Sequence, residues 1–392
     1  MPTSHIMRYV RTTLVTAGAV AGAAAALLLV SLMLPVKVWR TGELPTVPLP
    51  VAPARADWPA PARLWIDTDA ACGQGPRTDP DDCLALLLLA QEERVEVIGA
   101  STVFGNAPLV DTDQTTRALM AFIEGEGGPR IPVYRGSWAP MAHVESPAAA
   151  PPPAHERLRA ALGQGPLTIV ALGPLTNIAL GLKDHPELHA NVTRLVAVMG
   201  RRKGHVFHPI EGATARSFLG HGPVFRDFNV TEDPEAAAAV VAMALPMTLV
   251  PYEAARDVAV DPAILDRMAD RGGTAAWVAQ RARHWLTYWR EDIGLEGFYP
   301  FDLVAAAYVI EPSLLHCADV PIAVTEDTWL FGWLGYRGLF VAADNQADSR
   351  PQAAGSALYC PDVSEHLAAW LAERLTSTPD RDRQRTVSIA TR

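Results

Sequence analysis

The sequence predicts an α/β protein whose mainly parallel, doubly wound open sheet carries helices on both faces and is preceded by one N-terminal transmembrane helix. Short apolar runs alternate with segments of helical periodicity along most of the 392 residues. Such alternation is typical of βαβ units and of a parallel sheet. Near the N-terminus, a longer apolar stretch without charge has the length of a membrane span.

The predicted strands and helices follow one another along the chain. Strands are expected at 63–66, 95–103, 168–172, 195–199 and 247–251. Helices are expected at 83–90, 115–123, 175–182, 234–244 and 264–268. The strands are short apolar runs, whereas the helices show apolar positions at helical spacing.

The N-terminal region predicts a membrane anchor. Residues 12–36 hold no charged side chain and follow a basic segment at 1–11. At ~1.5 Å per residue, such a helix can cross a bilayer. A cleaved signal peptide is the alternative, but the cleavage-like site Ala54-Arg55-Ala56 lies far beyond the apolar stretch. We therefore predict a retained single-pass anchor, and because basic residues flank both of its ends, its orientation stays open.

The remaining chain divides into a spacer, a globular domain and a tail. Residues 37–62 are rich in Pro and Ala and are predicted to form a semi-rigid spacer. The globular domain is expected at 63–375, followed by a polar, disordered tail at 376–392. We expect the domain to be extracytoplasmic and attached to the membrane through the N-terminal helix.

Composition restricts the class of partner. The chain has 33 basic and 43 acidic residues, which gives a formal net charge of -10. It contains no cluster of Lys and Arg interleaved with aromatic residues, so a nucleic acid polymer is a poor partner. A small-molecule substrate is favoured.

Acidic residues are concentrated where the first strand of the domain ends and the next helix begins. Five carboxylates fall within sixteen residues, namely Asp67, Asp69, Asp79, Asp81 and Asp82. Alternate residues of a strand share a face, so Asp67 and Asp69 can converge on one ion. Oxygen ligands without His or Cys favour Ca²⁺ or Mg²⁺ over zinc. The alternative for Asp81 and Asp82 is that they only cap the helix.

These residues resemble the motif Asp-x-Asp-x-Gly-x-Asp-Asp-x-x-Ala-Leu of the inosine-uridine preferring nucleoside hydrolases. The resemblance continues in order through further segments, so that it covers roughly 63–375. The matching segments are 102–106, 115–119, 171–179, 198–200, 227–237 and 301–314. Two departures stand out, an insertion at 70–80 and Phe301 where the family has His.

The resemblance implies a nucleoside hydrolase-like fold and calcium-dependent hydrolysis of the N-glycosidic bond of ribonucleosides. A metal-activated water would attack, and Asp69 would act as general base. The Ca²⁺ ligands implied are Asp69, Asp82, the backbone carbonyl of Thr176, and Asp302. The residues implied to contact ribose are Asp81, Asn106, Met199, Asp227 and Asn229. The family also implies a homo-oligomer.

The base contacts are less determined, because Phe301 cannot donate a proton to a leaving base. We expect the aromatic residues Tyr288, Trp289 and Tyr299 to contact the base, with core packing as the alternative. A membrane-tethered protein that binds calcium and ribose without turnover is a second interpretation. A haloacid dehalogenase-type phosphatase is a third, although Ala70-Ala71 does not fit its motif.

The four cysteines, Cys72, Cys83, Cys317 and Cys360, permit disulfides without requiring them. A bridge between Cys72 and Cys83 would hold the inserted loop beside the carboxylates. We expect four reduced thiols.

We predict that the full-length chain fractionates with membranes and that deletion of residues 1–40 releases a soluble, folded protein, because the charge-free span is the attachment. Ultracentrifugation followed by immunoblotting measures this. Full-length protein in the supernatant with its N-terminus intact would contradict the anchor.

Overall fold

The computed structural model describes residues 22–23, 25, 49–55, 58, 60–75, 77–144, 153–202, 227–329, 334–341 and 353–377. Among these residues, no helix is long and apolar enough to cross a membrane. The predicted span at 12–36 falls outside them except for three positions, and the tail from 378 onward falls outside them as well.

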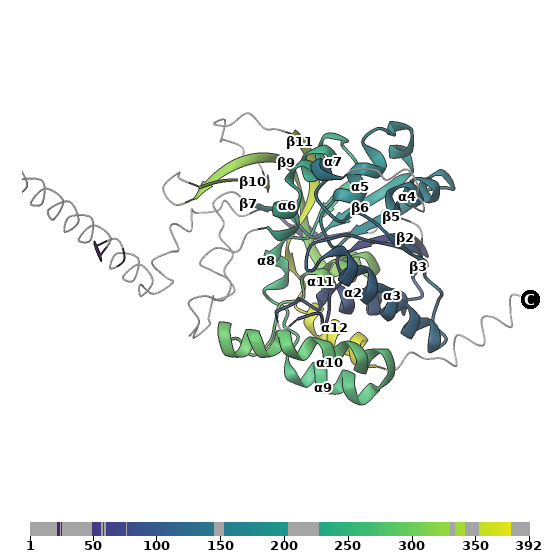
Figure 1. Cartoon of the computed structure of the whole chain (residues 1–392), viewed down its shortest axis with the longest axis vertical. Coiled ribbons are helices and arrows are strands. Elements are labelled where there is room, and N and C mark those ends of the chain that lie inside the picture. The colour runs from purple at the N-terminus through teal and green to yellow at the C-terminus, as the bar shows by residue number, and fades with distance from the viewer. Residues whose placement is uncertain are drawn as a thin grey trace, which may run out of the picture.

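One mixed sheet forms the centre of the fold (Figure 1). Its spatial order is β4-β3-β2-β5-β6-β8-β11-β9-β10-β7, and β1 pairs with β9. The strands are β1 Ala52–Pro53, β2 Ala62–Thr68, β3 Val95–Thr102, β4 Val133–Arg135, β5 Leu167–Ala171, β6 Val192–Ala197, β7 Arg201–Arg202, β8 Met247–Leu249, β9 Leu315–Trp329, β10 Leu334–Val341 and β11 Ala353–Val363.

Helices cover both faces of this sheet (Figure 1). On one side lie α2 Asp81–Ala90, α3 Leu109–Gly125 and α11 Phe301–Ile310, and outside them α9 Pro262–Arg271, α10 Gly273–Tyr288 and α12 Leu367–Thr376 pack on these helices and on one another. The other face packs against α4 Ala154–Gly163, α5 Thr176–Leu182 and α7 Pro234–Ala242. Two short helices, α6 Phe228–Glu232 and α8 Tyr252–Ala255, lie between strands and longer helices in the chain.

Strand β2 shows why the sequence folds into this layered arrangement. Its side chains alternate between the two hydrophobic cores, since Leu64 and Ile66 belong to one core and Trp65 belongs to the other. A strand covered on both faces needs a continuous apolar run rather than a polar alternation. The run that ends at Asp67 therefore places the first carboxylates at the carboxyl end of a central strand.

The expected strands and helices in the first two thirds of the domain are confirmed, with ends shifted by a few residues. The strands β2, β3, β4, β5, β6 and β8 pair in parallel. The sheet is mainly parallel, as expected, but it is mixed, because β9 pairs in antiparallel with β10, β11 and β1.

The predicted spacer at 37–62 is partly integrated in the sheet. Strand β1 pairs with His316 and Cys317 at the start of β9, and the Ala54 N–H donates to the Leu315 carbonyl at 2.9 Å. Ala54 is buried, and Trp58 packs against the core. The globular unit therefore begins near residue 52 rather than 63.

The cysteines form two disulfides, so the expectation of reduced thiols is wrong for this structure. Cys72 is bonded to Cys83, and Cys317 is bonded to Cys360. The first bond attaches the inserted loop to the first turn of α2, one residue after Asp82. The second bond joins the antiparallel neighbours β9 and β11. Sequence spacing alone does not reveal such pairs, because they depend on how closely distant strands approach.

We predict that the double variant Cys317→Ser/Cys360→Ser loses about 4 kcal/mol of unfolding free energy, because this disulfide closes a loop with a sequence separation of 43 residues. Denaturant unfolding under oxidising conditions measures the loss. Cys72→Ser/Cys83→Ser is the matched control, since its separation of 11 residues predicts a smaller loss, about 3 kcal/mol. Equal unfolding midpoints for the wild type and the first variant would contradict the stabilising role.

Candidate active site

Five buried aspartates meet at the carboxyl end of the central strands. Asp67 and Asp69 come from the end of β2, Asp81 and Asp82 open α2, and Asp302 lies in the first turn of α11. None of the five side chains is more than 3% exposed. The first turn of a helix favours negative side chains, which accounts locally for three of these positions.

The three aspartates from the helices form a group of metal-ligand type. One carboxylate oxygen from each of Asp81, Asp82 and Asp302 lies within 4.8 Å of the others. Asp81 joins the two helices, because its Oδ2 accepts the Asp302 N–H at 3.0 Å and its Oδ1 accepts the Asp82 N–H at 3.1 Å. The starts of α2 and α11 are thereby held at one point.

Asp69 is fixed beside this group by Asn106. The Asn106 N–H donates to Asp69 Oδ2 at 2.8 Å, and its side-chain amide donates to Asp82 Oδ2 at 3.0 Å. The other oxygen, Asp69 Oδ1, is buried without a hydrogen-bond partner in the described part of the chain. A Cβ at Gly105 would lie 1.9 Å from Asp69 Oδ2, and one at Gly173 would lie 3.0 Å from Oδ1, so the carboxylate needs glycine at both positions.

Asp67, which the sequence places with Asp69 on one face of the strand, is held by partners outside the metal-ligand group. Its Oδ1 accepts hydrogen bonds from the Ser101 hydroxyl and from the Asn177 amide, the latter at 2.8 Å. Ser101 in turn accepts a bond from Trp65 Nε1 at 2.8 Å. The second oxygen of Asp67 is buried without a partner among the described residues. Sequence reasoning missed Ser101 and Asn177 as its supports, because both come from distant segments.

Burial dominates the electrostatics of the cluster. Desolvation, reinforced by the negative charge of Asp81, raises the pKa of Asp82 to about 6, although hydrogen bonds from its neighbours oppose this. Desolvation likewise raises the pKa of Asp67 to about 7. The pKa values of Asp69 and Asp302 lie well above the ordinary range, first through burial and then through the neighbouring carboxylates. Without a compensating cation, these carboxylates therefore hold their protons to higher pH than exposed aspartates do.

The donor set fits a hard divalent cation. Every side-chain donor in the group is a carboxylate oxygen, and two buried carboxylate oxygens close to it have no partner among the described residues. Ca²⁺ and Mg²⁺ prefer such ligands, and a bound cation would replace the protons that burial otherwise retains.

The inserted loop contributes a sixth carboxylate. Asp79 Oδ1 accepts the Asp81 N–H at 3.2 Å, and the side chain is half-buried. Burial and the charge of Asp81 raise its pKa well above the ordinary value. The loop is held by the disulfide at Cys72 and by a bond from the Gln74 amide to Thr115 Oγ1 at 2.8 Å. The insertion thus places Asp79 directly beside Asp81.

Three of the residues expected to contact ribose, Met199, Asp227 and Asn229, lie at the ends of β5 and β6, whereas Asp81 and Asn106 lie in the carboxylate group. Asp227 caps α6 by accepting the Val230 N–H at 3.2 Å, and it also accepts the Gly200 N–H at 2.6 Å. Burial raises its pKa to about 6. The Asn229 amide donates to the carbonyls of Leu172 and Val198 at 2.7 and 2.9 Å, so only its carbonyl oxygen is left to face a ligand. Met199, which precedes Gly200, is buried.

Thr176 begins α5 at the same edge of the sheet. Its hydroxyl donates to Asp233 Oδ2 at 2.6 Å, and Asp233 Oδ1 caps α7 by accepting the Ala236 N–H at 3.0 Å. This bond fixes the start of α5 against α7. The role predicted for Thr176 concerned its backbone carbonyl, and that role stays a prediction.

The aromatic residues expected at the base form a packed group. Trp289 is fully buried and lies 4.8 Å from Tyr299 between ring centroids, while Tyr288 is 5% exposed. This burial favours core packing for Trp289. The guanidinium of Arg77, from the inserted loop, lies 4.9 Å from the centre of the Tyr288 ring. The insertion therefore reaches this aromatic group as well as the carboxylates.

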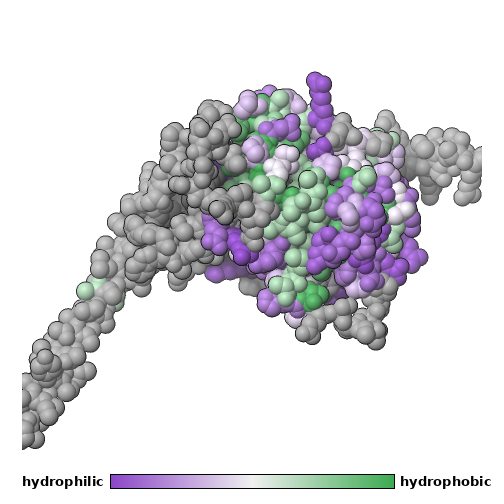
Figure 2. Space-filling view, turned by 90° about the horizontal axis from the view of Figure 1, so that it is seen from above, coloured by the Kyte–Doolittle hydropathy of each residue, from purple (hydrophilic) through white to green (hydrophobic). Residues whose placement is uncertain are grey.

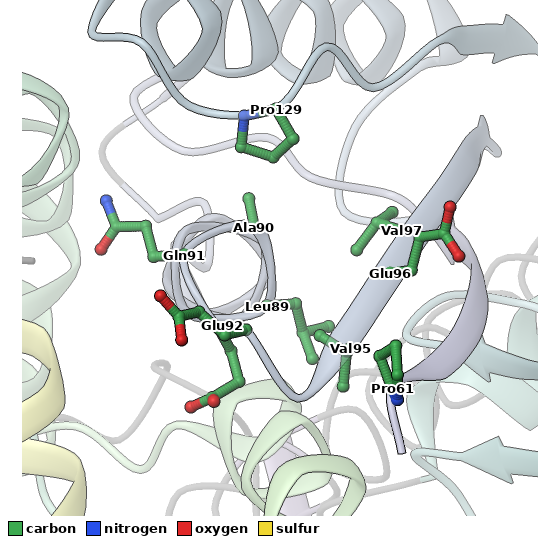
Figure 3. Close-up of a pocket in the computed structure, with 10 residues that line it drawn as sticks. Pro61, Leu89, Ala90, Gln91, Glu92, Val95, Glu96, Val97 and Pro129 are labelled. Atoms are coloured by element: carbon green, nitrogen blue, oxygen red, sulfur yellow. The ribbon is translucent and has the colours of Figure 1, made fainter. Parts of the chain in front are cut away.

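A surface cavity of about 340 Å³ lies elsewhere (Figure 3). It is lined by residues at the end of α2 and the start of β3, including Leu89, Glu92, Val95 and Pro129. The aspartates lie at the opposite end of α2, and ten helical residues span ~15 Å. Glu92 is already paired with Arg94 and Arg374, at 3.2 and 2.8 Å. This cavity is therefore separate from the carboxylate site.

The described surface carries both hydrophobic and hydrophilic residues. Figure 2 shows hydrophobic residues lying between hydrophilic ones over the described part of one face. The large hydrophobic side chains that are exposed include Val110, Phe122, Trp138 and Phe228. Phe228 lies between Asp227 and Asn229, so this part of the site reaches the surface.

Comparison with known proteins gives consistent matches. The sequence model described as inosine-uridine preferring nucleoside hydrolase matches residues 64–360. The chain is 28% identical over 258 residues to the pyrimidine-specific ribonucleoside hydrolase RihA of Klebsiella pneumoniae, covering 60% of this chain and 77% of the relative. It is 27% identical to uridine nucleosidase 1 of Arabidopsis thaliana, covering 64% of this chain and 75% of the relative.

Solved structures show the same fold. The plant nucleoside hydrolase PpNRh1 aligns with a TM-score of 0.63 at 20% identity, covering 81% of this chain and 100% of that one. A purine-preferring ribonucleoside hydrolase from Gardnerella vaginalis aligns with a TM-score of 0.59 at 18% identity, covering 80% and 98% of the two chains.

We predict that the protein binds Ca²⁺ and that Asp82→Ala weakens this binding by at least about 100-fold, because it removes one of few ligands from a buried site. Affinity should also rise from about pH 5 to about pH 8, because protons on carboxylates such as Asp82, with a pKa of about 6, must leave before the cation binds. Calorimetry with Ca²⁺ measures both effects.

Asp266→Ala is the control for this prediction. Asp266 is a carboxylate 63% exposed at its side chain, on α9, where it pairs with Arg283. Its loss should leave calcium affinity unchanged. Equal affinity in the wild type and Asp82→Ala would overturn the metal assignment.

Proposed function

This chain belongs to the inosine-uridine preferring nucleoside hydrolase family, and we propose that it hydrolyses the N-glycosidic bond of ribonucleosides to ribose and free base in a calcium-dependent reaction. The observation that carries the proposal is the group of buried aspartates at the carboxyl edge of the sheet, with buried oxygens that lack partners in the described part of the chain. In open α/β sheets, this edge is where ligands bind.

The residues proposed to hold the calcium ion are Asp69, Asp82, Asp302 and the backbone carbonyl of Thr176. When bound, the ion neutralises the buried carboxylates and lowers the pKa of an adjacent water molecule. Asp82 is oriented for this role, because the Thr68 hydroxyl and the Asn106 amide both donate to it. Its carboxylate therefore needs no rearrangement to act as a ligand.

Asp69 is the proposed general base. Asn106 occupies only its Oδ2, so Oδ1 is left to take a proton from the attacking water. The water oxygen then bonds to C1′ of the ribose, and the C1′–N bond breaks with its electron pair leaving on the base.

The ribose is proposed to lie over the carboxylates. Bond cleavage develops positive charge on the sugar, and the surrounding aspartates stabilise that charge. Asp81 is fixed by two backbone N–H groups and can still accept a bond from a ribose hydroxyl. The other proposed contacts come from Asn106, Met199, Asp227 and Asn229. Asp79, which adjoins Asp81, is an additional acceptor supplied by the insertion.

The leaving base is proposed to meet the aromatic group. Phe301 is buried at the start of α11 and has no proton to donate. Tyr288 and Tyr299 therefore remain the proposed base contacts, whereas the full burial of Trp289 favours a supporting role in the core. RihA of Klebsiella pneumoniae is described as pyrimidine-specific and the Arabidopsis relative as a uridine nucleosidase, so uridine is the first substrate to test. We also propose a homo-oligomer anchored by its N-terminal segment, with the active site outside the cytoplasm.

A second candidate function is a tethered protein that binds calcium and ribose without turnover. The observation that favours it is Phe301, because loss of a proton donor slows departure of the base while leaving the sugar site intact. Release of free ribose from uridine distinguishes the enzyme from this binding protein.

We predict that ribonucleosides are cleaved and that 2′-deoxyribonucleosides are poor substrates, with a ratio of kcat/KM that can reach about 10⁴. A site built from hydrogen-bond acceptors for hydroxyls is left with unpaired polar groups when one hydroxyl is missing. The measurement is free sugar released from uridine and 2′-deoxyuridine by the calcium-loaded protein. Comparable values of kcat/KM would contradict a site that binds the 2′-hydroxyl.

A further inference from the structure

The Cys72–Cys83 disulfide closes a ring of backbone that carries half of the carboxylates at the proposed metal site. The two cysteines are 11 residues apart in the sequence. The ring between them contains three of the six clustered aspartates, namely Asp79, Asp81 and Asp82. Asp69 precedes Cys72 by three residues, and Cys83 directly follows Asp82. The bond therefore connects the two proposed metal ligands Asp69 and Asp82 through a short covalent path.

The carboxylates of this ring repel one another, so the ring needs support. Asp81 acts electrostatically on both Asp79 and Asp82. Like charges that lie close together in a buried site favour separation of the segments that carry them. The disulfide opposes this separation, because Cys72 and Cys83 are 2% and 0% exposed and belong to one hydrophobic core. The ring is thus attached to the core at both of its ends.

We propose that the Cys72–Cys83 disulfide is a positioning element of the metal site, which holds the aspartates of the ring in the arrangement that binds calcium and makes calcium affinity depend on the oxidation state of this bond. The inference rests on the proposed function, because it needs the calcium site. A bond that keeps ligands in their binding arrangement raises affinity, since less conformational freedom is lost on binding. The segment closed by Cys317–Cys360 contains none of the clustered aspartates, so that disulfide has no such effect.

Reduction of the bond by a dithiol follows a balanced exchange. A thiolate of the reductant attacks one sulfur, the S–S bond breaks, and the second thiol of the reductant then resolves the mixed disulfide. Two electrons and two protons pass to the protein, which is left with two thiols, and the reductant becomes a cyclic disulfide. Because oxidation and calcium favour the same arrangement, bound calcium must shift the equilibrium toward the disulfide by the factor by which the disulfide strengthens calcium binding.

The first test is calorimetry with Ca²⁺ on the wild type and on Cys72→Ser/Cys83→Ser. We expect the calcium dissociation constant of the variant to be about 10- to 100-fold larger, the usual effect of removing support from metal ligands. Cys317→Ser/Cys360→Ser is the matched control, because it also lacks one disulfide and the loop that it opens is longer. Its calcium affinity should equal that of the wild type. Equal affinity in Cys72→Ser/Cys83→Ser and the wild type, or an equal fall in both variants, would overturn the proposal.

The second test uses the wild type alone, so it does not depend on whether a variant folds. The protein is equilibrated with mixtures of reduced and oxidised dithiothreitol, either with saturating Ca²⁺ or with a chelator. Free thiols are then alkylated and assigned by peptide mass spectrometry. We expect calcium to raise the oxidised-to-reduced ratio of Cys72–Cys83 by about 10- to 100-fold and to leave that of Cys317–Cys360 unchanged. No shift for Cys72–Cys83, or an equal shift for both disulfides, would contradict the positioning role.

These measurements separate the inference from the proposed function. Both tests measure calcium binding and disulfide state, whereas release of ribose from uridine measures the hydrolase activity. A protein that shows the coupling but releases no ribose refutes the activity and supports the inference. A protein that releases ribose without the coupling supports the activity and refutes the inference. Absence of calcium binding by the wild type also overturns the inference.

Discussion

The buried negative charge where β2, α2 and α11 meet is the constraint on which the rest of the site depends. Isolated carboxylates are very costly to bury. The first turns of two helices, which meet here, offset part of this cost. Hydrogen bonds to the carboxylates offset more of it, and they come from the backbone N–H groups of Asp82, Asn106 and Asp302 and from the hydroxyls of Thr68 and Ser101. Two oxygens still lack partners in the described region. Buried carboxylate oxygens without partners do not stabilise the fold. A bound cation, which would pair with them, explains why they are present.

The same constraint organises the neighbouring elements. Glycine at 105 and 173 allows the backbone to close around Asp69, and Asn177 links Asp67 to the carbonyl of Thr102 at 3.0 Å. On the far side, Asp227 holds Gly200, and Tyr252 connects that region to α11. These contacts connect the carboxylate group, the proposed ribose-binding residues and the starts of the helices to one another. The proposed active site is therefore held by the ends of several strands and helices rather than by one loop.

The sequence predicted the parts of this arrangement that are local. The apolar run before Asp67 and the leucine-rich segment after Asp82 specify a strand and a helix by themselves. The sequence did not predict β9, because Pro321 interrupts the apolar alternation there. The structure nevertheless buries the apolar side chains of this strand, namely Leu315, Cys317, Val320, Ile322 and Val324. The sequence also missed contacts that depend on tertiary approach, namely the two disulfides, Asn177 on Asp67, and Tyr252 on Phe301.

Strand β1 has a practical consequence for how the molecule is prepared. It pairs with the start of β9, shortly after Glu311, whose carboxylate bonds Arg94 at 2.9 Å just before β3. The start of β9 also pairs with the end of β11, so that β1, β9 and β11 are joined where the described domain begins. A shortened chain that starts after residue 54 would therefore lose a strand of the sheet and leave the start of β9 without one of its neighbours, so a soluble version for crystallisation should keep residue 52.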